Sequence, residues 1–312
     1  MAKTELQKYL DPKVLTKIGR LDLQARLVVE GFISGLHRSP FRGFSVEFAE
    51  HREYVPGDDI KHIDWKVWGR NDRFYIKQYE EETNLRATFL VDVSESMRYG
   101  ERGGRRSDRL SKYHYAACTA AALGHLLLGQ QDAIGLATFD EDLRAYVPPS
   151  ANPNQIKSFV HELDVASLKA KTTIEPICHN LAEEIPRRGL ICLISDLFVD
   201  ADGLMRGLRH FRHRDHEVIV LHTLDEDELN FPFQGNTLFR GLEATGELMI
   251  EPRALRRGYL DAVESFCADV KRRCIADRID YKRVSTADRL DAALLAFLAA
   301  RAAAARKTGA KR

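Results

Sequence analysis

The sequence predicts an α/β protein with a doubly wound, mostly parallel sheet and a small β-rich amino-terminal subdomain. From residue 86 onward, short apolar runs alternate with longer segments of helical periodicity, and this alternation is typical of parallel strands joined by crossover helices. Residues 44–81 instead show short aromatic and alternating runs around the turn Pro56-Gly57-Asp58-Asp59. The 312 residues, 44% of them hydrophobic, are enough to bury a sizeable core.

The elements follow in order from these patterns. Apolar residues at helical spacing from Leu21 to Leu36 predict an amphipathic helix. The strands expected after it are Arg86–Val93, Ala133–Phe139, Leu190–Ser195, Glu217–His222 and Ile279–Val284. The helices expected between and around them are Tyr113–Leu128, Asn154–Leu163, Glu175–Ile185, Leu204–Phe211 and Arg253–Cys274.

Two further segments complete the chain. Leu238–Pro252 predicts a hairpin that bends at Ala244-Thr245-Gly246, and we expect it to extend one edge of the sheet. Asp288–Arg306 is rich in Ala and Leu and predicts a closing helix. The predicted organisation is therefore an amino-terminal region of residues 1–85, an α/β domain of residues 86–306 and a basic tail of residues 307–312.

Composition bounds the possible partners and the cellular location. The chain has 47 Lys and Arg against 46 Asp and Glu, so the overall charge gives no reason to expect nucleic acid or an anionic membrane as a partner. The five cysteines form no C-x-x-C pair, which favours reduced core thiols. No apolar run is long enough for a signal peptide or a membrane span, so we expect a cytoplasmic protein.

The segment from Phe89 to Met97 carries the most chemistry. It is an apolar run that ends on Asp92, followed by hydroxyls at Ser94 and Ser96. Open α/β sheets bind ligands beyond the carboxyl ends of their strands, so these oxygens are expected in one loop. One carboxylate and two hydroxyls suit Mg²⁺, with Ca²⁺ or Mn²⁺ as substitutes, better than Zn²⁺. The alternative is that these side chains only cap a helix or form a turn.

Other ligands should lie at the ends of neighbouring strands. A second apolar run ends on Asp196, and Lys171-Thr172-Thr173 opens the helix before that strand. Asp92, Ser94, Ser96, Thr172 and Asp196 are therefore the predicted metal ligands, with Thr172 alternatively a helix cap and Asp196 alternatively the start of a turn. An open coordination position would accept an acidic side chain of a partner.

This D-x-S-x-S, Thr and Asp arrangement resembles the metal-ion-dependent adhesion site of von Willebrand factor A domains. A second resemblance, to the bacterial domain of unknown function family 58 (DUF 58), covers nearly the whole chain. It is carried by Ser45-Val46-Glu47-Phe48, Arg52-Glu53-Tyr54-Val55-Pro56-Gly57-Asp58-Asp59, His62-Ile63-Asp64-Trp65-Lys66, Tyr75-Ile76-Lys77-Gln78-Tyr79-Glu80-Glu81-Glu82, the metal loop, Arg187-Arg188-Gly189, Ser195-Asp196 and Glu243-Ala244-Thr245-Gly246.

The resemblance implies a von Willebrand A-like fold and a non-enzymatic adaptor or chaperone-like partner of a MoxR-type AAA+ ATPase. It departs from the family at Thr173, where Asp is frequent, and in lacking the amino-terminal membrane helices of many members. The residues that flank the metal ligands are candidates for contacting the partner: Glu95, Arg98, Arg105, Arg106 and Thr173.

Two alternatives remain open at this stage. Asp58, Asp64 and Lys66 loosely match the carboxylates and lysine of metal-dependent nucleases. The other alternative is a structural scaffold with an unoccupied metal site. No G-x-S-x-G elbow, Walker loop, G-x-G-x-x-G or H-E-x-x-H occurs, which removes most support for hydrolase, nucleotidase and dehydrogenase functions.

Overall fold

The computed structural model describes residues 11–15, 21–36, 51–53, 75–77, 85–100, 109–168, 171–185, 187–241, 246–295 and 297–299. The chain forms two compact units, one of Met1–Gly35 with Leu85–Arg312 and one of Leu36–Asn84. In the smaller unit, β1 (His51–Glu53) and β2 (Tyr75–Lys77) pair antiparallel, with His51 opposite Lys77. The remainder of the predicted β-rich region lies outside the described residues.

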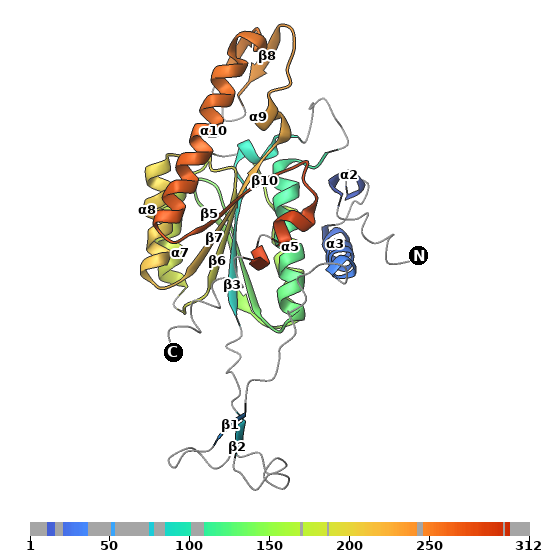
Figure 1. Cartoon of the computed structure of the whole chain (residues 1–312), viewed down its shortest axis with the longest axis vertical. Helices are drawn as coiled ribbons and strands as arrows, with labels where there is room; N and C mark the ends of the chain where they lie inside the picture. Colours follow the sequence, from blue (N-terminus) through green and yellow to red (C-terminus); the bar gives the residue numbers. More distant parts are fainter. Residues whose placement is uncertain are drawn as a thin grey trace. The chain divides into compact units, whose positions relative to one another are not determined.

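The larger unit contains a six-stranded sheet in the order β10-β7-β6-β3-β4-β5 (Figure 1). All neighbouring strands in it are parallel except β4 and β5, so the predicted α/β class with a mostly parallel sheet is confirmed. The strands are β3 (Arg86–Asp92), β4 (Ala133–Phe139), β5 (Leu143–Ser150), β6 (Leu190–Ser195), β7 (Glu217–Leu224) and β10 (Asp280–Ser285).

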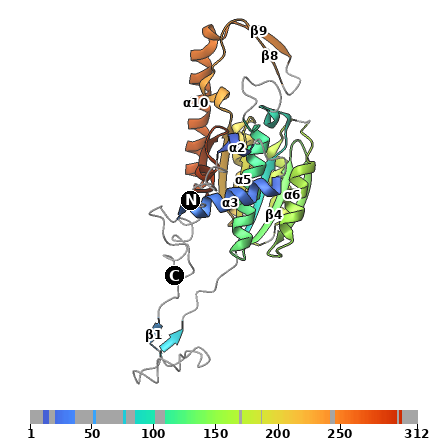
Figure 2. The ribbon, with the colours of Figure 1, turned by 90° about the vertical axis from the view of Figure 1, so that its right-hand side faces the viewer.

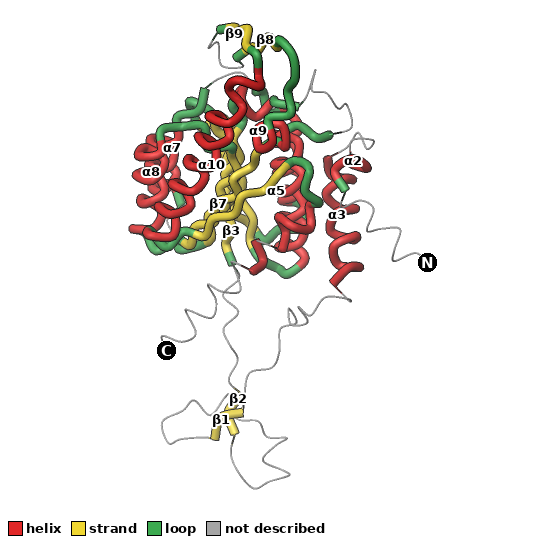
Figure 3. Tube along the Cα trace, turned by 45° about the horizontal axis from the view of Figure 1, so that its top comes forward, coloured by secondary structure: helices red, strands yellow, loops and turns green. Residues whose placement is uncertain are grey.

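Helices cover both faces of the sheet, as the red helices around the yellow strands show (Figure 3). On one face lie α5 (Lys112–Gly129) and α6 (Gln155–Val165), and on the other α7 (Ile174–Glu184), α8 (Ala201–His213) and the lower part of α10 (Pro252–Ala276) (Figures 1 and 2). The described helices and strands overlap every helix and strand predicted after residue 85, with small shifts at their ends.

The central strand β3 shows why the sheet is buried on both faces. Phe89 contacts the rings of Phe159 and Phe297 on one side, with centroids 5.6 and 5.9 Å away. Its neighbour Leu90 belongs to the other core, with residues of α7 and α8 such as Leu181 and Leu208. Successive strand residues point to opposite faces, so a continuous apolar run is needed wherever both faces are covered.

The edge strand β5 is absent from the sequence predictions. It carries Pro148 and Pro149 and alternates poorly, because an edge strand needs neither a full set of N–H donors nor two apolar faces. It approaches β4 closely: a Cβ on Gly135 would lie 2.8 Å from the Val147 carbonyl oxygen. The glycine therefore permits the pairing at the irregularity between Ile134 and Leu136.

The predicted hairpin forms, but not where expected. Strands β8 (Thr237–Arg240) and β9 (Glu247–Ile250) pair antiparallel as a separate two-stranded sheet, so the prediction that they extend the main sheet is wrong. The hairpin packs instead through Phe239, whose ring stacks on Phe231 at 5.7 Å. Residues 242–245 of its bend lie outside the described residues.

The amino-terminal helices belong to the α/β unit. They are α2 (Pro12–Leu15) and the predicted α3 (Leu21–Leu36), whose Ala25 and Val28 are buried. Gln24 of α3 hydrogen-bonds through its Oε1 to His114 Nε2 of α5 at 2.8 Å. This differs from the predicted division at residue 85, because α3 lies beside α5 and belongs to the same compact unit (Figures 1 and 2).

The closing helix is present at residues 290–295 and 297–299, where Leu290 and Phe297 are fully buried. Residues 300–312, including the predicted basic tail, lie outside the described residues. Among the helices that the structure describes, none is long and apolar enough to cross a bilayer.

Candidate metal centre

The candidate site lies at the carboxyl end of β3, where the strand order reverses. The neighbours of β3 are β4 and β6, and the helices that follow β3 and β6 in the chain, α5 and α8, lie on opposite faces of the sheet (Figure 1). The loops after β3 and β6 therefore diverge, and the position between two such loops is the usual ligand site in a doubly wound sheet. Asp92, Ser195 and Asp196 lie at these two strand ends.

Asp92 is a fully buried carboxyl group. Its Oδ1 accepts a hydrogen bond from the Ser94 backbone N–H at 2.9 Å, and its Oδ2 accepts one from the Ser195 hydroxyl at 2.5 Å. Burial, followed by the negative charge of Asp196, raises the pKa of Asp92 to about 7, although the hydrogen bonds from Ser195 and Ser94 oppose the rise. An anion at position 92 therefore needs a positive charge nearby.

Three hydroxyls converge near this carboxyl group. Ser94 Oγ and Ser96 Oγ are 3.0 Å apart, and Thr172 Oγ1 lies 3.4 Å from both carboxylate oxygens of Asp92. Ser96 lies in the 3₁₀ turn η3 (Glu95–Arg98), and Ser94 is the residue directly before it. Met97 of this turn is fully buried and anchors it. Thr172 precedes α7, whose N-cap Thr173 makes no side-chain cap bond. The capping alternative is therefore not what holds these two threonines.

Asp196 is engaged by a lysine that the sequence reasoning missed. Lys112 Nζ lies 2.7 Å from Asp196 Oδ2 and 2.7 Å from Glu228 Oε1. Burial alone would lower the pKa of Lys112, but the two carboxylates outweigh it and the pKa is raised. A lysine in the first turn of a helix opposes the helix dipole, so its position at the start of α5 was a signal that acidic partners lie nearby.

Glu228 belongs to the short helix α9 (Glu226–Asn230), which follows β7. Its Oε2 accepts the Asp225 backbone N–H at 2.8 Å as part of a capping box, which the D-x-x-E spacing could have revealed. Burial raises the pKa of Glu228, and Lys112 opposes that rise. Arg109 pairs with Asp225, Glu226 and Asp227, so α9 is fixed to the start of α5 by two cations.

His222 fixes the backbone of Asp196. Its Nε2 donates to the Asp196 carbonyl oxygen at 2.8 Å, and its Nδ1 accepts from the Tyr281 hydroxyl at 2.6 Å. Burial lowers the pKa of His222 to about 4, so the ring is neutral at pH 7. His222 is a structural support of the site and supplies no charge to it.

The residues predicted to contact a partner divide into two groups. Glu95 and Arg98 are partly exposed and pair with each other at 3.9 Å, and Thr173 is exposed while its N–H donates to the Asp140 carbonyl oxygen at 2.9 Å. Arg105 and Arg106 lie outside the described residues, as do the predicted nuclease residues Asp58, Asp64 and Lys66.

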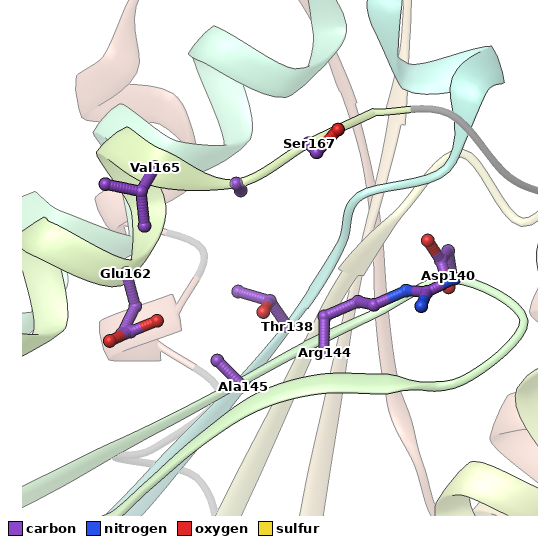
Figure 4. A pocket seen from close by; sticks show the side chains of 8 residues that line it. Thr138, Asp140, Arg144, Ala145, Glu162, Val165 and Ser167 are labelled. Carbon is purple, nitrogen blue, oxygen red and sulfur yellow. The ribbon is translucent and has the colours of Figure 1, made fainter.

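A cavity of about 350 Å³ lies between the β4–β5 hairpin and the end of α6 (Figure 4). Its walls include Asp140, Arg144 and Glu162, and Arg144 extends toward Asp140, with its Nε 2.6 Å from Asp140 Oδ1. None of the five predicted metal ligands lines this cavity. It is therefore separate from the candidate metal centre.

The donor chemistry at Asp92 fits a hard divalent ion. No group of three His, Cys, Asp or Glu side chains in the described part of the chain is arranged to hold an ion, so an ion there would need ligands of other kinds. Ser94, Ser96 and Thr172 supply hydroxyls beside the carboxyl group of Asp92, and Mg²⁺ accepts such all-oxygen shells. The five cysteines are all buried and free, and none is among these donors.

Comparisons with known proteins identify a family and several relatives of this chain. A family model described as "Protein of unknown function DUF58" matches residues 50–266. Uncharacterized protein Rv1480 of Mycobacterium tuberculosis and Uncharacterized protein Mb1516 of Mycobacterium bovis are each 27% identical over 267 residues, which cover 84% of this chain and 81% of each relative.

Several solved structures are also similar. Conserved hypothetical protein BatB from Bacteroides thetaiotaomicron is 16% identical, covers 70% of this chain and 98% of its own, and has a TM-score of 0.46. An aerotolerance-related membrane protein from Bacteroides fragilis is 17% identical, covers 67% of this chain and 94% of its own, and has a TM-score of 0.45. The SpRpn10 VWA domain is 14% identical, covers 68% of this chain and 94% of its own, and has a TM-score of 0.38. Because the family model spans most of the chain, including the whole of β3, β6 and the candidate metal centre between them, this protein belongs to the DUF58 family.

Proposed function

We propose that this protein is a non-enzymatic interaction module that binds a partner protein through a divalent cation, Mg²⁺ or in its place Ca²⁺ or Mn²⁺. Asp92, Ser94 and Ser96 would ligate the ion directly. Thr172 would ligate it directly or through a water molecule, and Asp196 would ligate it directly or act on it through an intervening group. The observation that carries the proposal is the convergence of hydroxyls from two separated segments on the buried carboxyl group of Asp92. The ion would supply a positive charge to which a carboxylate of the partner binds.

The expected partner is a MoxR-type AAA+ ATPase, for which this chain would act as an adaptor. That expectation rests on the resemblance to the family and not on the geometry of the site. The structural support is the position of the donors in loops at the carboxyl end of the sheet, where Ser96 and Thr172 are partly exposed.

A metal titration monitored by thermal unfolding tests the proposal. Mg²⁺ at 100 times its dissociation constant should stabilise the folded state by about 2.7 kcal/mol if it does not bind the unfolded chain. Asp92→Asn should abolish the rise in melting temperature, whereas Asp140→Asn, which changes another buried aspartate at the same edge, should retain it. A wild-type melting temperature that is independent of Mg²⁺ would reject the metal-dependent function.

A second candidate, a scaffold that uses no metal, is favoured by one observation. Lys112 already supplies a buried positive charge to Asp196 and Glu228. In such a scaffold the carboxylates serve to fix α5, β6 and α9 to one another. The same titration separates the two candidates, since a scaffold gains no stability from Mg²⁺.

A further inference from the structure

Lys112 lies at the border of the candidate metal centre with its charge fully enclosed. Its side chain is 1% exposed, and its Nζ contacts one oxygen each of Asp196 and Glu228 at 2.7 Å. The ring of Phe198 covers the ammonium group at 4.8 Å from the ring centroid. Lys112 therefore has no route to solvent, and its charge acts on its two carboxylate partners.

Both oxygens of Asp196 accept a hydrogen bond, and one of these bonds comes from the charged ammonium group of Lys112. Oδ2 accepts from Lys112, and Oδ1 accepts from the Phe198 backbone N–H at 3.2 Å. The backbone of Asp196 is held as well, by His222. The oxygens of Asp92, in contrast, face only hydroxyls and one N–H of the chain, and receive no ammonium or guanidinium group in the described structure.

We propose that Lys112 is a positioning residue that withholds Asp196 from direct metal ligation, so that Asp92 is the chain's single carboxylate on the ion. This inference rests on the proposed function. Its consequence is a charge balance: a divalent ion held by one carboxylate and neutral hydroxyls keeps one positive charge. That charge favours an acidic side chain of the partner over a neutral one as the completing ligand.

The charges of the triad Lys112, Asp196 and Glu228 make the inference quantitative. One ammonium and two carboxylates sum to one negative charge in the wild type. Lys112→Met raises this to two negative charges, Asp196→Asn reduces it to zero, and the double variant Lys112→Met/Asp196→Asn returns it to one. If Lys112 controls the availability of Asp196, the affinity for Mg²⁺ should be highest for Lys112→Met and lowest for Asp196→Asn. The wild type and the double variant should lie between them.

Titration calorimetry of the full chain with MgCl₂ measures these affinities. We expect Lys112→Met to bind Mg²⁺ about tenfold more tightly than the wild type. The substitution leaves one more uncompensated negative charge near the ion, and the attraction of that charge lowers the binding free energy by at least about 1.4 kcal/mol, which corresponds to a factor of ten. The double variant should lose that gain. Lys112→Arg is the matched control, because it keeps the charge and should keep the wild-type affinity.

The outcomes separate this inference from the proposed function. If the wild type binds Mg²⁺ and a folded Lys112→Met binds no more tightly, the role of Lys112 is rejected while the metal site stands. If neither protein binds Mg²⁺, the metal-dependent function and the inference both fail.

Should Lys112→Met fail to fold, Asp196→Asn decides the question. A loss of affinity within about tenfold supports the inference, since one charge is removed at a distance from the ion. A complete loss, equal to that of Asp92→Asn, shows that Asp196 is a direct ligand and overturns the inference. Glu228→Gln removes the same charge from the far side of Lys112 and should weaken Mg²⁺ binding less than Asp196→Asn does.

Discussion

The carboxyl group of Asp92 is buried, so it lacks the water molecules that ordinarily solvate a carboxylate. Side-chain hydroxyls and a backbone N–H take the place of that water, and the closest of them is Ser195, 2.5 Å from Oδ2. Ser195 also accepts the Leu197 N–H at 2.9 Å, so it connects the carboxylate to the loop after β6. A buried polar group is costly when a partner is removed, so this serine should matter for stability.

Ser195→Ala is predicted to lower the free energy of unfolding by about 1–3 kcal/mol, the range for leaving buried polar groups without a partner. Urea unfolding monitored by circular dichroism measures the change. Ser158→Ala, at an exposed position of α6, is the control and should change stability by less than about 0.5 kcal/mol. Equal effects of the two substitutions would show that the Ser195 bond to Asp92 contributes nothing.

His216 should make the protein sensitive to mild acid. Burial lowers its pKa below the ordinary value near 6.5, and its Nδ1 accepts the Gly189 N–H at 3.2 Å. Below about pH 6.5, His216 therefore binds fewer protons in the folded state than in the unfolded state. The stability that neutral His216 contributes is fully present above about pH 6.5 and is lost as the pH falls toward the folded-state pKa.

Comparison of His216→Asn with the wild type tests this sign, because an Asn side chain can still accept the N–H but cannot titrate. The loss of stability between pH 7.5 and pH 5.5, measured by urea unfolding, should be smaller in His216→Asn than in the wild type. Exposed His213 is the control, and His213→Asn should reproduce the wild-type difference. A wild-type-sized loss in His216→Asn would contradict the assignment.

At this scale, the sequence indicated that Asp92, Ser94, Ser96 and Thr172 lie together, since strand ends and helix starts were predicted there. The oxygens of Asp196 instead accept from Lys112 and the Phe198 N–H. Metal binding at these residues stays a prediction. Lys112 and Glu228 were missed because their contacts join segments 84 and 116 residues apart, and no local pattern encodes such a pair.

Among the elements, the edge strand β5 and the hairpin β8–β9 show the limits of local patterns. Two prolines obscured β5, although its pairing with β4 is ordinary apart from two irregularities. The hairpin was recognised from its turn. Its placement depends on the packing of Phe239 against Phe231 and Phe233, and of Phe231 against Tyr259, which the alternation of residues does not specify. Strand existence is a local property, whereas strand placement is a tertiary one.

Two glycines allow an element-level test with opposite expected signs. Gly135→Ala in β4 should lower the free energy of unfolding by about 1–3 kcal/mol, because its Cβ would meet the Val147 carbonyl oxygen and the Pro149 ring below 3 Å. Gly258→Ala in α10 meets no atom within 4 Å and should raise it by about 0.5–1 kcal/mol, since alanine favours helices. Urea unfolding compares them, and destabilisation by Gly258→Ala would contradict the helix packing described.

For the whole molecule, the alternation of strands and helices was sufficient to predict the fold class. It predicted the parallel core of the sheet and the end of the sheet at which the candidate site residues lie, because crossover helices leave few possible topologies. The assignment of α3 was harder, since an amphipathic helix does not reveal which surface covers its apolar stripe. Burial of Gln24 against His114 settles that question within the α/β unit.

If the proposed function is correct, binding of a MoxR-type AAA+ ATPase should depend on Asp92. Chelation is an unsuitable test, because such ATPases themselves use Mg²⁺ with nucleotide. Surface plasmon resonance with the full chain immobilised, at constant Mg²⁺ and ATP, should instead show at least about tenfold weaker binding for Asp92→Asn. Asp140→Asn should bind as the wild type does, and equal binding by Asp92→Asn would exclude a metal-mediated contact.

The two margins of the main sheet discourage growth by addition of foreign strands. On β5, neither Pro148 nor Pro149 has an N–H to offer, and their carbonyl oxygens already accept from Gln155 and Arg86. On β10, Asp280, Lys282 and Arg283 present charges to solvent. Proline and charge at sheet margins oppose amyloid-like stacking, so this protein should tolerate high local concentrations without polymerising through its sheet.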